Sequence, residues 1–195
     1  MALRYDILKD RRTGWLAIIG PAIALGVIAI CVIASPWFTW ENNAISDFGV
    51  HELAVLFNAS LVACGAMAAI FAVSVLLRLR AVHARIGMLM MFLASISLMG
   101  IGIFHENIRP WHFYFSVAFF VLLLLACLLF GTYLLGAKRT RYIGIFALLT
   151  AIVGIIGWSI DWGPGVAIPE ALTFVPGGIW FMLLGYWVLN RKPAD

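Results

Sequence analysis

Long apolar runs separated by short polar connections make up nearly the whole chain. The runs cover residues 14–35, 53–77, 86–104, 111–136, 142–160 and 171–190. Each comes close to or exceeds the roughly 20 apolar residues that a helix needs to cross a bilayer. The runs lack the alternation of a barrel strand, and a backbone in lipid must bond within its own segment, so each is predicted to be a helix. The pattern therefore predicts an all-α protein, in which residues 1–195 form a single compact bundle of six transmembrane helices.

The composition supports this prediction and excludes other classes of protein. Hydrophobic residues make up 64% of the chain and charged residues 11%, whereas soluble domains carry roughly 25% charged residues. The net charge is +4, but the basic residues lie in short clusters between apolar runs, which is typical of membrane topology and not of nucleic-acid binding. All three cysteines fall within apolar runs, which favours a packing role for Cys31, Cys64 and Cys127.

The basic residues also predict an orientation. Of the 13 lysines and arginines, all but Arg109 fall on one side of the six predicted spans. They are Arg4, Lys9, Arg11, Arg12, Arg78, Arg80, Arg85, Lys138, Arg139, Arg141, Arg191 and Lys192. Because cytoplasmic connections carry the excess of lysine and arginine, both termini are predicted to be cytoplasmic in a multi-pass protein of the cell membrane.

The opposite side collects acidic and histidine residues. They are Glu41, Asp47, His51, Glu52, His105, Glu106, His112, Asp161 and Glu170. Acidic residues are not part of the orientation rule, so their bias needs its own explanation. We expect an acidic, His-bearing extracytoplasmic face that binds a ligand.

The first connection of this face, ENNAISDFGVHE (residues 41–52), is longer and more polar than a turn requires. Its serine, aspartate and glycine predict a turn, in which Ser46 or Asp47 caps the second helix. Asp47 and His51 would share a helical face if that helix begins early. Neighbouring aromatic residues prefer the membrane interface, so we expect the loop to cover the outer mouth of the bundle. There Asp47 and His51 would meet His105, His112 and Asp161.

The connection FHENIRPWH (residues 104–112) is a second polar segment. It places His105 and His112 near one another at one depth, and histidine and carboxylate side chains are ligands of divalent metals. No HExxH, HxxxH or paired-cysteine spacing accompanies them. A metal site formed by His105, His112 and Asp47 is one hypothesis, and solvated loop residues are the other.

Asn58 is a polar residue inside the second predicted span, about 9 Å below Glu52 at the rise of an α-helix. An amide in hydrocarbon needs a partner, so Asn58 is predicted to bond within the bundle. The candidate partners are Ser95, Ser97 and Ser116, and contact with a ligand is the alternative.

Two prolines predict irregular helices. Pro21 lies inside the first span, and VPGGIW (residues 175–180) interrupts the sixth. Proline removes a backbone donor, so kinks are expected at both places. No Asp, Glu, Lys or Arg occurs at mid-membrane in any span, which argues against a proton pump or an ion-coupled carrier.

Three features carry a family resemblance: NAISDFG in the first outer loop, LFNASLVACG in the second span, and a histidine that opens the fourth helix. With six spans, they resemble the family filed as domain of unknown function 998, over nearly the whole chain. ISDFG more weakly resembles the outer loop of the Frag1/DRAM/Sfk1 membrane family, which implies links to lipid handling and autophagy. The serine, aspartate and histidines are similar to those of zinc-dependent hydrolases of the alkaline ceramidase type, whose HxxxH pair is missing. None of these resemblances supplies a catalytic residue.

The interpretation that asks least of the sequence is an integral membrane protein that binds a membrane lipid, a protein partner or a second copy through the acidic face. One alternative is a metal-dependent intramembrane lipid hydrolase with His105, His112 and Asp47 as ligands. Another is a small-molecule transporter, in which VPGG breaks a helix. Enzymatic activity and cofactor content are left open. The candidate binding residues are Ser46, Asp47, His51, Asn58, His105, Glu106, His112, Asp161 and Glu170.

Overall fold

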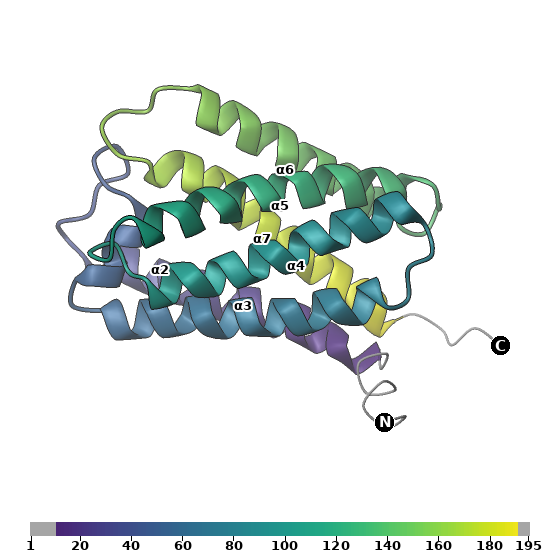
Figure 1. The fold of residues 1–195 in the computed structure, drawn as a ribbon. Helices are drawn as coiled ribbons and strands as arrows, with labels where there is room; N and C mark the ends of the chain where they lie inside the picture. Colours follow the sequence, from purple (N-terminus) through teal and green to yellow (C-terminus); the bar gives the residue numbers. More distant parts are fainter. Residues whose placement is uncertain (1–10, 191–195) are drawn as a thin grey trace.

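A computed structural model of the chain describes residues 11–190, and six long helices form a bundle (Figure 1). They are α2 (Gly14–Ala34), α3 (Ala54–Leu76), α4 (Val82–Ile103), α5 (Trp111–Leu135), α6 (Arg141–Ser159) and α7 (Ala167–Leu189). Two short 3-10 helices, η1 (Arg11–Thr13) and η2 (Ile45–Val50), precede α2 and α3. Each long helix is apolar and long enough to cross a membrane, and residues 11–190 contain no strand. The all-α prediction of six spans is therefore confirmed.

Two helices begin a full turn earlier than the apolar runs do. α4 begins at Val82 and α7 at Ala167, each four residues before the predicted start. The first turn of α4 contains His83 and Arg85, and that of α7 contains Pro169, so both turns fall outside the apolar pattern. Proline is tolerated in a first turn because its missing N–H has no partner in the helix there.

The helices pack in chain order, and α7 returns to lie beside α2. A Cβ atom on Gly14 would lie 2.5 Å from the carbonyl oxygen of Gly185, so the start of α2 touches the end of α7. Helices α2 and α7 each continue through a proline, Pro21 and Pro176. The predicted interruption of the sixth span at VPGGIW is therefore wrong. Instead, a Cβ atom on Gly178 would lie 3.6 Å from Cβ of Pro21, so this segment packs against α2.

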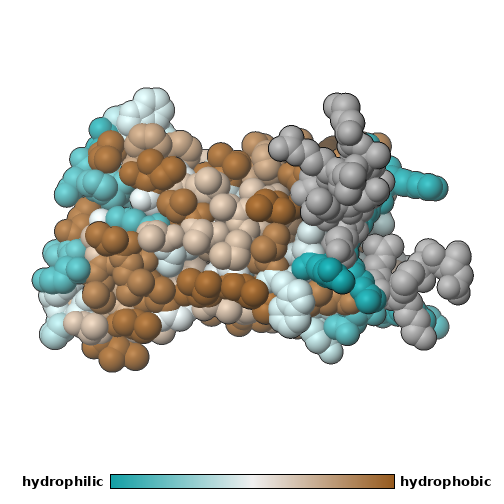
Figure 2. Space-filling model, turned by 90° about the horizontal axis from the view of Figure 1, so that it is seen from below, coloured by the Kyte–Doolittle hydropathy of each residue, from teal (hydrophilic) through white to brown (hydrophobic). Residues whose placement is uncertain are grey.

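An apolar belt separates two hydrophilic ends (Figure 2). The acidic end is formed by the connections 35–53, 104–110 and 160–166. The basic end is formed by the start of α2, the connections 77–81 and 136–140, and the end of α7. The predicted basic residues Arg4, Lys9, Arg191 and Lys192 lie outside the described part of the chain.

Candidate functional site: a groove at the acidic end

The first connection at the acidic end is docked onto the bundle. In η2, the side chains of Ile45 and Phe48 are 5% and 1% exposed. The Phe48 ring lies 4.7 Å from that of Phe38 and 5.4 Å from that of Trp37, measured between centroids. This aromatic packing fixes η2 over the ends of the neighbouring helices.

Backbone hydrogen bonds join the same connection to the one between α6 and α7. The Gly165 N–H donates to the Glu41 carbonyl at 2.8 Å, and the N–H groups of Val166 and Ala167 donate to the Asn43 carbonyl at 3.1 and 2.9 Å. A Cβ atom on Gly165 would collide with the Asn43 backbone, so glycine is required for this approach. Two connections distant in sequence therefore form one surface.

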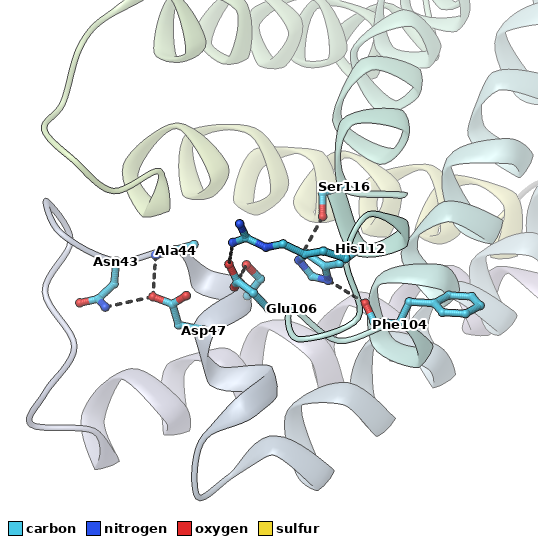
Figure 3. Close-up of polar contacts among 9 residues, drawn as sticks. Asn43, Ala44, Asp47, Phe104, Glu106, His112 and Ser116 are labelled. Carbon is cyan, nitrogen blue, oxygen red and sulfur yellow. Dashed lines mark hydrogen bonds and ion pairs between the residues drawn. The ribbon is translucent and has the colours of Figure 1, made fainter. Parts of the chain in front are cut away.

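Three carboxyl groups from three elements hold the start of η2. Asp47 Oδ2 accepts the Ala44 N–H and the Asn43 side-chain amide, both at 3.0 Å (Figure 3). Glu170 Oε2 accepts the Ile45 N–H at 2.6 Å. Glu106 Oε2 accepts the Ser46 hydroxyl at 3.1 Å. Carboxylates are favoured here because a helix N-terminus leaves N–H groups without helical partners.

This arrangement corrects several predictions about the loop. Asp47 caps η2 and not the second span, whose N-cap, Leu53, makes no side-chain cap bond. The His51 ring stacks on Trp37, with centroids 4.0 Å apart. Asp161 accepts the N–H of Gly163 at 3.0 Å within its own turn. These side chains are thus engaged in local contacts, and the predicted meeting of five residues is not formed.

The predicted metal ligands are also not assembled. Among residues 11–190, no group of three or more His, Cys, Asp or Glu side chains is arranged to hold a metal ion. Asp47 is engaged at η2, His112 contacts the Phe104 carbonyl, and His105 Nδ1 is buried without a partner. His105 and His112 are close in sequence, but their ring nitrogens have separate surroundings, so the two side chains do not form a shared site.

Asn58 bonds a backbone group instead of the predicted serines. Its side-chain amide donates to the Gly49 carbonyl at 2.9 Å, which ties α3 to η2. Ser95 and Ser97 donate to carbonyls of their own helix, those of Met91 and Leu93. Asn58 therefore holds the docked loop against α3.

A groove of about 850 Å³ opens between α5 and α6 at the acidic end. This volume falls within the range of about 300–1,000 Å³ that is typical of small-molecule sites. Its apolar walls include Phe113 and Val121, which are 61% and 50% exposed. In a bundle that crosses a membrane, such exposed apolar side chains lie against hydrocarbon, so the groove opens toward lipid.

The groove exists because α5 and α6 touch near the basic end and diverge toward the acidic end (Figure 1). A Cβ atom on Gly144 would lie 2.7 Å from the Gly131 carbonyl oxygen, so the two backbones are in close contact there. Farther along, a Cβ atom on Gly154 would lie 2.6 Å from Cδ2 of Leu124, which lines the deep end of the groove. Trp158 fills part of the space between the diverging helices, with its ring centroid 5.1 Å from that of Phe120.

The mouth of the groove at the acidic end is polar. It is lined by Ser46, Glu106, Arg109, Ser159 and Glu170, and His112 and Ser116 follow along α5. Arg109 forms a 3.1 Å ion pair with Glu106, and its side chain is 75% exposed. Glu170, in contrast, is 7% exposed. The groove thus combines a charged mouth with apolar walls.

A second cavity of about 100 Å³ lies in the centre of the bundle. It shares four lining residues with the groove: Ser46, Ser116, Phe120 and Glu170. These residues therefore form the partition between the lipid-facing groove and the interior of the bundle.

His112 lines the groove and makes two polar contacts (Figure 3). Its Nδ1 lies 2.8 Å from the Phe104 carbonyl oxygen, and its Nε2 lies 3.3 Å from the Ser116 hydroxyl. A carbonyl oxygen can only accept, so the neutral ring carries its proton on Nδ1 and leaves Nε2 as an acceptor. The Ser116 hydroxyl is then the donor of that pair.

The fold and site define a multi-pass α-helical membrane protein with an amphiphilic groove. The chain belongs to the family described as protein of unknown function (DUF998), which matches residues 18–187. No curated protein and no solved structure matches the chain. The family match confirms the resemblance to domain of unknown function 998 that the outer loop and the second span carry. No match supports the weaker resemblance to the Frag1/DRAM/Sfk1 family.

Five of the binding residues predicted from the sequence lie at or beside the polar mouth: Ser46, Asp47, Glu106, His112 and Glu170. Arg109, Ser116 and the apolar wall were not predicted as parts of the site. Arg109 could have been recognised because it is the one basic residue of the sequence on the acidic side of the predicted spans. The wall residues gave no signal, because every span is equally apolar and helix divergence is a property of the packed bundle.

Proposed function

We propose that the protein binds one membrane lipid in the groove, with the headgroup at the polar mouth and an acyl chain between α5 and α6. The observation that carries this proposal is the amphiphilic lining of an 850 Å³ groove on the membrane-facing surface. A water-soluble ligand would not favour an exposed apolar wall, whereas an acyl chain is itself apolar and suits such a wall.

The dimensions suit a lipid of one leaflet. The α5 wall runs from His112 to Leu124, which is about 18 Å of helix. Half of the roughly 30 Å hydrocarbon core is about 15 Å. A chain that enters at the acidic end therefore reaches the closed end of the groove near the middle of the bilayer.

The charges at the mouth favour a zwitterionic phospholipid. Arg109 is the cation of the lining and suits a phosphate, to which its guanidinium can donate two hydrogen bonds. Glu106, its ion-pair partner, suits an ammonium group. Exchanging this exposed pair for the two charges of the headgroup costs little, because exposed ion pairs contribute roughly 0–1 kcal/mol.

Lipid retention tests the proposal. The full chain, purified in mild detergent, would be incubated with dioleoyl phosphatidylethanolamine and examined by native mass spectrometry. We expect one retained lipid per chain, lost in Val121→Trp because the larger ring fills the groove. Val153→Trp is the matched control, because Val153 is exposed on α6 but does not line the groove.

The headgroup is tested by competition with dioleoyl phosphatidylglycerol. We expect the zwitterionic lipid to be preferred, and Glu106→Gln to shift the preference toward the anionic one. Equal retention by Val121→Trp and Val153→Trp, or no retention by the unmodified chain, would overturn the proposal.

A further inference from the structure

The pairing of Ser116 with His112 departs from the usual behaviour of a serine in a membrane helix. Such serines commonly donate to the carbonyl four residues earlier, as Ser95 and Ser97 do. At the groove, Ser159 follows the same rule and donates to the Ile155 carbonyl at 2.7 Å. Ser116 instead faces the acceptor nitrogen of His112.

The His112 ring is held in the orientation that a general base requires. It is 7% exposed, and the Phe104 carbonyl fixes both its tautomer and its direction. A hydroxyl within reach of a neutral imidazole that is oriented by a third group is the signature of an activated nucleophile. The 3.3 Å separation is loose, as is common before a substrate binds.

The pair also lies at the depth where ester groups of a bound lipid would be. Glu106 and Arg109 form the mouth, and Ser116 lines the groove one helical turn beyond His112, about 6 Å deeper. In an acyl lipid, the ester linkages follow directly below the headgroup. This step rests on the proposed function, since it requires the headgroup to lie at the mouth.

We propose that Ser116 and His112 form a catalytic dyad that cleaves an ester of the lipid in the groove. Ser116 Oγ attacks the ester carbonyl carbon while its proton passes to His112 Nε2. The bond between that carbon and the alcohol oxygen breaks, and the departing oxygen takes the proton from His112. Water then attacks the acyl-serine with His112 as base, which releases a fatty acid and restores the Ser116 hydroxyl.

A fluorophosphonate probe tests the nucleophile without any lipid. The full chain in detergent would be labelled, digested and mapped by mass spectrometry. We expect the label on Ser116, none in Ser116→Ala, and labelling slowed by about 100-fold or more in His112→Gln, the usual scale of general-base loss. Ser97→Ala is the matched control, because Ser97 donates within its own helix and does not line the groove, so this variant should label at the rate of the unmodified chain.

Absence of label on Ser116, label on Ser46 or Ser159 instead, or an unchanged rate in His112→Gln would overturn the dyad. Mapping the label on the unmodified chain identifies the nucleophile even where a variant fails to fold. The two proposals fail separately: lipid retained without label removes the dyad and leaves the binding function, whereas label without retained lipid removes the binding function.

Discussion

Glu170 on α7 accepts a hydrogen bond from the backbone N–H of Ile45 on η2 at 2.6 Å, across 125 positions of the sequence. The carboxylate is 7% exposed and lies on the partition between the groove and the inner cavity. Glu106 also binds the start of η2 from the connection between α4 and α5, and Asp47 bonds the Ala44 N–H from within η2. The docked loop and the groove are therefore parts of one polar network.

Removing the Glu170 side chain should destabilise the protein. Glu170→Ala leaves the Ile45 N–H without its acceptor, which costs about 1–3 kcal/mol for a buried group. Glu170→Gln retains an acceptor oxygen and should cost less. The melting temperature measured in detergent should be highest for the unmodified chain, lower for Glu170→Gln and lowest for Glu170→Ala. Equal melting temperatures for Ala and the unmodified chain would show that this bond does not hold η2.

Gly49 and Asn58 should show energetic coupling. A Cβ atom on Gly49 would lie 2.8 Å from Asn58 Oδ1, and the Asn58 amide donates to the Gly49 carbonyl. Gly49→Ala therefore displaces the amide, and Asn58→Ala removes a bond that contributes about 1 kcal/mol. We expect the double variant to cost less than the sum of the single ones, by about 0.5 kcal/mol or more. Additive costs in this cycle would contradict direct contact.

The contact between α5 and α6 at Gly144 should not tolerate a methyl group. A Cβ atom there would lie 2.7 Å from the Gly131 carbonyl and 3.0 Å from the Leu135 backbone nitrogen, neither of which can rotate away. Gly144→Ala should cost about 1–3 kcal/mol through overpacking. Gly26→Ala is the control, because nothing lies within 4 Å of its added Cβ atom. Similar stability of both variants would argue against the close approach.

The acidic end should face away from the cytoplasm. Arg11, Arg12, Arg78, Arg80, Lys138 and Arg139 all lie at the basic end, and the excess of such residues marks the cytoplasmic side. A reporter that is fluorescent only in the cytoplasm should be active when fused after Lys192. It should be inactive when inserted between Glu41 and Asn42. The reverse result would place the groove in the cytoplasmic leaflet.

The six spans and the acidic and basic ends could be predicted from the sequence, because a bilayer demands long apolar helices and leaves charges in the connections. Helix starts were harder wherever a first turn holds charged residues, histidine or proline, as at His83 and Pro169. The outer loop was also recognisable as unusual from ENNAISDFGVHE alone. Its fold as η2 was not, since its acceptors Glu106 and Glu170 come from distant elements.

Tertiary structure decided the site. Asp47 caps η2 and His51 stacks on Trp37, whereas four-residue spacing favoured a shared face. Ser116 and His112 were both visible in the sequence, but their relation depends on the ring direction that the Phe104 carbonyl sets. The groove has no sequence signature, because it arises where two equally apolar helices separate. Lipid selects apolar residues for every outward surface alike, and so composition cannot tell a flat wall from a binding groove.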